Sequence, residues 1–103
     1  MKVKISELIG PALDWAVAKC EGWKSGWRPS CQHNFSTDWF HGGPIIEREM
    51  ISVMWDTGNS CWNADCDHGI VVVSWGPTPL IAAMRCYVAS KLGDKVEVPE
   101  ELK

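Results

Sequence analysis

The sequence predicts an α+β fold: a small antiparallel sheet of about three to four strands, packed by two main helices. Three observations predict it. Three β-prone segments with short turns between them lie in the middle of the chain. A segment with clear helix start and stop signals follows them, and a segment with helical spacing precedes them. The chain has 103 residues, so we expect residues 1–103 to form a single domain.

The N-terminal part predicts a short strand and a helix. Residues 2–5 alternate polar and apolar side chains, as strands do. The helix is predicted to begin at Ser6, or at Pro11 because proline is favoured at the first helical position, and to run to about Glu21. Its apolar side chains recur at helical spacing on one face. They are Ile9, Leu13, Ala16, Val17 and Cys20.

Residues 22–36 have no periodicity and predict a long loop, of the kind that is often functional. The S-T-D that follows offers three plausible helix N-caps, Ser36, Thr37 and Asp38. Pro44 is then predicted to open a further helical turn.

The three β-prone segments are 51–55, 61–65 and 70–75. The turn signals D-T-G-N at 56–59 and C-D-H-G at 66–69 separate them. Consecutive strands with short connections predict an antiparallel meander.

The last helix has the clearest boundaries. Thr78 is the predicted N-cap, Pro79 the first helical residue, and Gly93 the residue after the end. The predicted buried stripe consists of Ile81, Met84, Val88 and Leu92. Residues 94–103 are mostly acidic and polar and predict an extended acidic tail.

Composition narrows the classes of function. The net charge is −3 and the ten Lys and Arg are scattered, which argues against binding duplex nucleic acid. No run approaches the ~20 apolar residues of a membrane span, and no signal peptide is evident, so we expect no membrane partner and a cytoplasmic protein. Five Cys predict reduced thiols. Seven Trp are hard to bury in so small a core, so some are expected to line a pocket or an interface.

Three segments carry a resemblance to a known family: L-D-W-A-V-A-K-C-E-G at 13–22, S-T-D-W…G-G-P-I-I-E-R-E at 36–49, and the long block that begins G-P-T-P-L-I-A-A-M-R at 76–102. They resemble the NinX-type small proteins of lambdoid phages and prophages. The layout is also similar to phage α-β-α sandwich domains, which share an S-T-D segment ahead of a helix. The resemblance covers roughly half to two-thirds of the chain and does not cover about 54–70.

The resemblance implies a phage accessory protein in the bacterial cytoplasm, and it supplies no reaction. Small phage accessory proteins often counter host defence, and some act as sponges that sequester a nucleotide immune signal. They also often self-associate, so a homo-oligomer is expected. This analogy is one of class and not of residues.

Two aromatic segments are candidate ligand contacts. S-T-D-W caps a helix in one reading; in the other, its hydroxyls and the backbone of the following glycines bind phosphate while Trp39 stacks on a base. G-W-K-S-G-W-R either folds its Trp side chains over the core or combines stacking with phosphate pairing. Two arginines are candidates to balance phosphate charge. The predicted contacts are Trp23, Trp27, Ser36, Thr37, Asp38, Trp39, Gly42, Gly43, Arg48 and Arg85.

Metal binding and catalysis have weaker signals. The pairs C-Q-H and C-D-H place Cys31 with His33 and Cys66 with His68, but their spacing is not the usual one for zinc. No spacing marks a nucleophile with its base. We therefore expect no cofactor, no metal and no enzymatic turnover.

The leading hypothesis is a protein that sequesters a nucleotide-type small molecule. The alternative is an inhibitor of a host defence or DNA-metabolism protein that uses exposed Trp and the acidic tail. A concave Trp cluster that encloses a basic residue would favour the first hypothesis. A flat or convex Trp patch would favour the second.

Overall fold

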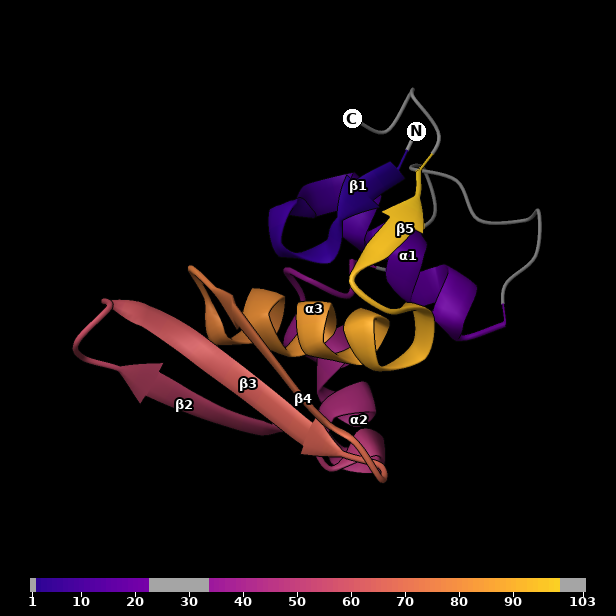
Figure 1. The fold of residues 1–103 in the computed structure, drawn as a ribbon. Helices are drawn as coiled ribbons and strands as arrows, with labels where there is room; N and C mark the ends of the chain where they lie inside the picture. The colour runs from indigo at the N-terminus through magenta and orange to yellow at the C-terminus, as the bar shows by residue number, and fades with distance from the viewer. Residues whose placement is uncertain (1, 23–33, 99–103) are drawn as a thin grey trace.

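The computed structural model describes residues 2–22 and 34–98, which form an α+β arrangement of helices and strands (Figure 1). In chain order the elements are β1 (Lys2–Lys4), the 3₁₀ helix η1 (Ile5–Glu7), α1 (Gly10–Cys20), α2 (Trp39–Glu49), β2 (Ser52–Asp56), β3 (Cys61–Asp67), β4 (Val71–Gly76), α3 (Pro79–Leu92) and β5 (Lys95–Glu97). The α+β class is confirmed. The described residues hold three α-helices where two main ones were predicted, because the S-T-D-W segment opens a full helix.

The predicted meander is confirmed. Strands β2, β3 and β4 form an antiparallel sheet in that order. Asn63 on the central strand lies opposite Met54 on one side and Trp75 on the other. A second, two-stranded sheet joins the ends of the described chain, with Val3 of β1 opposite Val96 of β5. The first part of the predicted tail is therefore paired with the N-terminal strand.

Helix α3 is the centre of the molecule. As predicted, the Thr78 hydroxyl accepts a hydrogen bond from the Ile81 N–H at 3.1 Å, and the helix ends before Gly93. The prediction of one buried stripe was too narrow, because every residue from Leu80 to Val88 is buried. The three-stranded sheet covers one side of α3, and α1, α2 and the β1–β5 pair cover the others (Figure 1).

Two details of the helix starts correct the prediction. Of the two predicted starts of α1, Pro11 is within one residue of the observed start at Gly10. Ser6 is wrong, because residues 5–7 form the separate turn η1 and Ile9 is extended and exposed, off the predicted apolar face. Pro44 lies inside α2 and does not open it. A proline there cannot donate to the Phe40 carbonyl. The Phe40 position is strongly exposed, so water can take the place of that donor.

The far end of the β2–β3 hairpin extends beyond α3 (Figure 1). There the rings of Trp55 and Trp62 meet edge to face with centroids 5.3 Å apart. The hairpin therefore carries its own aromatic contact where the helix no longer supports it.

Candidate functional site

Helix α2 begins where the sequence placed a cap. The Asp38 carboxylate accepts the Phe40 N–H at 2.9 Å, and the Asn34 carbonyl accepts the N–H groups of Thr37 and Asp38. Of the three predicted caps, Asp38 is thus confirmed. Trp39 follows the cap and is 54% exposed. The Trp side chains of the loop, Trp23 and Trp27, lie outside the described residues.

Ser36 points into the protein. It is 1% exposed, and its N–H donates to the Asp14 carboxylate of α1 at 2.8 Å. Its hydroxyl lies beside the same carboxyl, although the geometry falls short of a hydrogen bond. Ser36 therefore ties the turn before α2 to α1.

Burial raises the pKa of Asp14, and the contacts with Ser36 and the charge of His41 offset this only in part. A carboxyl with a raised pKa in the folded state stabilises the fold most below its unfolded pKa of about 4. That contribution is lost as the pH rises through the folded pKa. The fold therefore disfavours the ionised form of this buried carboxyl, which has no arginine or lysine partner among the contacts described for it.

We expect Asp14→Asn to be at least as stable as the wild type at pH 7, because the amide oxygen can still accept the Ser36 N–H and carries no charge. Its advantage should shrink as the pH falls toward 4. Thermal unfolding midpoints of both proteins between pH 4 and 7 measure this difference. A difference that is constant with pH would contradict the assignment.

The two glycines of α2 have different surroundings. Gly42 is buried against the Phe35 carbonyl and the Leu80 side chain, and its N–H donates to the Asp38 carbonyl at 2.9 Å. Gly43 is half-buried beside the Trp39 ring. Gly42 therefore serves close packing between α2 and α3.

Arg48 lies near the other end of α2, about 15 Å along the helix from the cap. Its guanidinium donates to both carboxylate oxygens of Glu21, to Glu49 at 2.9 Å and to the Tyr87 hydroxyl. Burial alone would raise the pKa of Glu21, but hydrogen bonds from Arg48 and Tyr87 outweigh it and keep this pKa low. The cluster joins the ends of α1 and α2 to α3.

Arg85 is 5% exposed. It donates to the Leu8 carbonyl and to the Trp75 carbonyl, each at 2.9 Å, and its guanidinium lies 5.4 Å from the centre of the Trp75 ring. It thus links the end of β4 to Leu8, which lies just before α1 in the chain, through carbonyl oxygens. Both arginines are already engaged by protein groups.

The candidate metal ligands do not gather. Within residues 2–22 and 34–98 no group of three or more His, Cys, Asp or Glu side chains is placed to hold a metal ion. Cys66 is buried, with its Sγ 3.5 Å from that of Cys86, whereas His68 is exposed and its Nε2 contacts the Glu49 carbonyl. Cys31 and His33 lie outside the described residues.

The structure shows a candidate binding surface that was not predicted from the sequence. Alternate residues of β2, β3 and β4 share the face of the sheet opposite to Ala64 and Cys66, and we call this surface the outer face. It consists of Ser52, Met54, Asp56, Cys61, Asn63, Asp65, Asp67, Val71, Val73 and Trp75. The opposite face carries the buried side chains Ala64 and Cys66. The alternation in C-W-N-A-D-C-D was the signal that could have found it.

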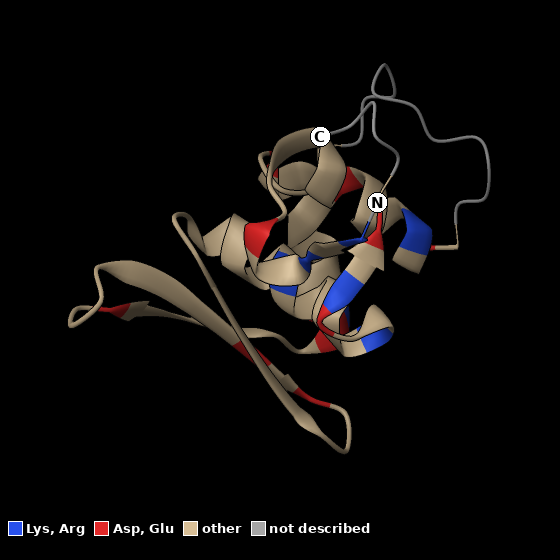
Figure 2. Ribbon diagram, turned by 45° about the horizontal axis from the view of Figure 1, so that its top comes forward, with Lys and Arg blue, Asp and Glu red and all other residues tan. Residues whose placement is uncertain are grey.

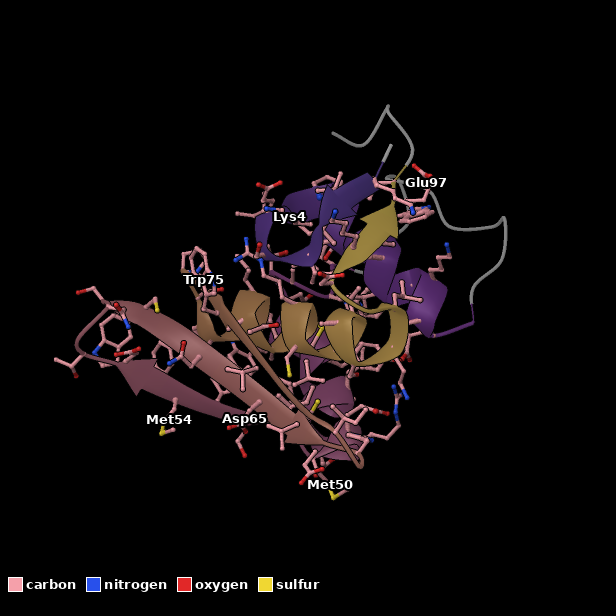
Figure 3. All side chains as sticks on the ribbon, in the orientation of Figure 1. Lys4, Met50, Met54, Asp65, Trp75 and Glu97 are labelled. Atoms are coloured by element: carbon pink, nitrogen blue, oxygen red, sulfur yellow. The ribbon has the colours of Figure 1, made fainter. Side chains whose placement is uncertain are left out.

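The outer face combines apolar side chains with acidic ones. Met54, Val71, Val73 and Trp75 are 51–64% exposed. They lie on the two edge strands and flank the polar side chains of β3, among them Asp65. Met54 and Asp65 project from the side of the sheet away from α3 (Figure 3). Exposed apolar patches that are rimmed by polar residues often mark interaction sites.

No Lys or Arg occurs from residue 50 to residue 84, although this segment contains three Asp. Figure 2 shows the result: the sheet carries acidic positions alone, and the basic positions lie on the part built from the helices and the β1–β5 pair. The described Trp residues are spread over α1, α2 and the sheet and do not form one cluster. The outer face therefore suits a basic partner better than a phosphate.

The family of the chain can now be stated. A family model described as "Bacteriophage P22, NinX" matches residues 4–91. The chain belongs to this NinX family. The match includes the whole three-stranded sheet, which the sequence resemblance left partly unplaced, and it identifies a phage accessory protein. Comparison with curated proteins gave no match. No helix within the described part of this NinX-family chain is long and apolar enough to cross a membrane.

Proposed function

We propose that this NinX-family chain is a non-catalytic accessory protein that binds a host protein through the outer face of its three-stranded sheet. One observation carries the proposal: the outer face exposes four large apolar side chains beside three Asp, in a segment without Lys or Arg. Apolar side chains supply the affinity of protein interfaces, and charges around them select the partner.

The charge of the outer face indicates the chemistry of the partner. A protein that covers Val73 and Trp75 must also face Asp65 and Asp67 on the neighbouring strand. Unpaired carboxylates are costly to bury, so the partner should bring Lys or Arg to them. Proteins that handle DNA carry such basic faces. A host protein of defence or of DNA metabolism is the class that fits.

Sequestration of a nucleotide-type molecule at the start of α2 is the second candidate. The exposed Trp39 beside the capped N-terminus of α2 favours it, since helix N-termini bind phosphate and indoles stack on bases. The engagement of Arg48 and Arg85 by other protein groups weighs against it. A thermal-shift panel of mononucleotides, cyclic di- and trinucleotides and NAD-derived molecules tests this candidate.

The test of the leading proposal compares which host proteins are captured by three immobilised forms of the chain. The three forms are the wild type, Val73→Lys and Ile9→Lys. Val73 lies on the outer face, whereas Ile9 lies outside the sheet, and both are well exposed. Lysine is well tolerated on edge strands, so the first variant should fold. We expect one host protein to bind the wild type and Ile9→Lys but not Val73→Lys. After purification, this host protein should form a 1:1 complex with the wild type.

Four results would contradict the proposal. Val73→Lys could retain the host protein as well as the control does. The captured protein could fail to form a complex once purified. The face could instead capture a second copy of the chain, which would make it a dimer interface and support the predicted homo-oligomer. A large rise of the thermal unfolding midpoint with one nucleotide, together with no protein partner, would favour nucleotide binding at the start of α2.

A further inference from the structure

A small cavity on the outer face deepens this proposed function, on which the inference rests. The cavity has a volume of about 370 Å³ and is lined by Asn59, Cys61, Asn63 and Trp75. We call it the notch. It lies beside the β2–β3 turn, in the part of the sheet where Met54, Asn63 and Trp75 stand side by side.

The polar groups of the notch are oriented by one carboxylate. The Asp56 Oδ2 accepts the side-chain N–H of Asn59 at 2.8 Å and that of Asn63 at 3.1 Å. The Asn59 backbone N–H donates to Asp56 Oδ1 at 3.2 Å. These hydrogen bonds, those from Asn59 first, keep the pKa of Asp56 below its usual range, so the group is ionised at neutral pH. The amides cannot be reversed, because an amide oxygen would then face the carboxylate.

The orientation of the two amides determines which polar groups of the notch are available to a ligand. Both amide nitrogens are directed at Asp56, so the amide oxygens of Asn59 and Asn63 are the groups left to accept hydrogen bonds. The Asn63 oxygen has one weak contact, with the Cys61 thiol at 3.9 Å. The Trp75 ring adds a half-exposed π-face. Amide oxygens, a carboxylate and an indole together favour a cation that donates several hydrogen bonds.

The positive group known to contact the lining of the notch is Arg85, whose donors are already engaged. It lies against the Trp75 ring but donates to two backbone carbonyls and is almost wholly buried. A cation that enters the notch is repelled by Arg85, and the negative charge of Asp56 offsets this repulsion. The three strands themselves supply no Lys or Arg that could fill it.

We propose that the notch receives an arginine side chain of the protein partner. The planar guanidinium would stack on Trp75 and donate to the amide oxygens of Asn59 and Asn63, with Asp56 behind them as the countercharge. The apolar stem of the arginine would leave the notch toward Met54 and Val73, which the body of the partner covers. Arginine suits this site better than lysine, because its flat, multi-donor group matches a ring and several acceptors.

An NMR titration tests the notch without knowledge of the partner. The probe is N-acetyl-arginine amide, and the matched neutral probe is N-acetyl-citrulline amide, at equal ionic strength. We expect the indole N–H of Trp75 and the side-chain amides of Asn59 and Asn63 to shift along a saturating curve with the arginine probe. The citrulline probe should bind at least about fivefold more weakly, because it lacks the charge.

Two variants identify the site. Trp75→Leu removes the ring and keeps an exposed apolar side chain, so it should abolish the saturating shifts of Asn63. Trp39→Leu is the matched control, because Trp39 is exposed to nearly the same extent on α2, and it should leave the titration unchanged. Equal shifts with both probes, or an unchanged titration in Trp75→Leu, would overturn the proposal.

The two experiments distinguish a wrong proposal about arginine binding in the notch from a wrong proposal about the function of the outer face. If the outer face binds a protein without an inserted arginine, Val73→Lys loses the partner and the arginine probe gives no saturation. If the arginine probe saturates while Val73→Lys keeps the partner, the notch is a cation site and the protein interface lies elsewhere.

Discussion

Replacing Gly42 by alanine is expected to lower the thermal unfolding midpoint by about 10–20 °C. A Cβ at this position would overlap the Phe35 carbonyl and lie 2.6 Å from Leu80 Cδ1. The Phe35 carbonyl belongs to the backbone and cannot rotate away. The overlap must therefore be relieved by a shift of α2 away from the turn that precedes it and from Leu80 of α3, which costs about 2–3 kcal/mol in a well-packed core.

Gly43→Ala is the matched control, one residue further along the same helix. Its Cβ would meet only the Trp39 ring, at an ordinary 4.0 Å. Since alanine is the better helix former, this variant should be neutral or more stable by up to about 1 kcal/mol. Differential scanning calorimetry on both variants measures the contrast. Similar midpoints for the two would show that α2 does not pack against α3 as described.

Arg85→Met is expected to destabilise the fold by about 2–4 kcal/mol, although it removes no carboxylate contact. The methionine can fill most of the space of the arginine stem, but the carbonyls of Leu8 and Trp75 lose their charged donor. Because Arg85 is buried, water cannot easily replace it. The loss should also loosen the end of β4 that carries Trp75.

Lys91→Met is the control for Arg85→Met. Lys91 lies on the same helix and pairs with Glu49 at 3.6 Å, but it is well exposed to solvent. Such exposed pairs contribute little, so the control should change the free energy of unfolding by less than about 1 kcal/mol. Urea unfolding curves of both variants give the comparison. An Arg85→Met curve that coincides with that of the wild type would contradict the role of Arg85 as an internal connector.

Local signals explain which parts of the fold could be predicted. The boundaries of α3 follow from Thr78, Pro79 and Gly93, and the strands follow from β-prone runs between turn residues. These features act over a few residues. The cap of α2 was among the predicted ones, but the continuous length of the helix was missed, because Pro44 reads as the first residue of a separate helical turn, whereas an exposed helix surface tolerates it inside.

Features that depend on contacts between distant segments could not be read from the sequence. Arg85 was predicted as a ligand contact, but it lies 77 residues from Leu8 in the sequence and donates to the Leu8 carbonyl only in the fold. The burial of α3 on all sides likewise depends on elements from both ends of the chain.

The outer face was missed for a related reason. The V-V-V run predicts a strand but does not say which of its side chains are buried, and the exposure of Val71 and Val73 appears only once α3 is seen to cover a single face of the sheet. Of the predicted ligand contacts, Thr37, Asp38 and Trp39 lie together at the start of α2. Their role in ligand binding stays a prediction.

The central claim is that the outer face of the sheet binds a basic host protein. Its most direct test is the Kd of the purified partner for the wild type, Val73→Lys and Ile9→Lys, measured by isothermal titration calorimetry. We predict that Val73→Lys weakens binding by about 100-fold or more, or roughly 2.7 kcal/mol, while Ile9→Lys stays within about threefold of the wild type. Equal affinities for the two variants, with both folded, would contradict the claim.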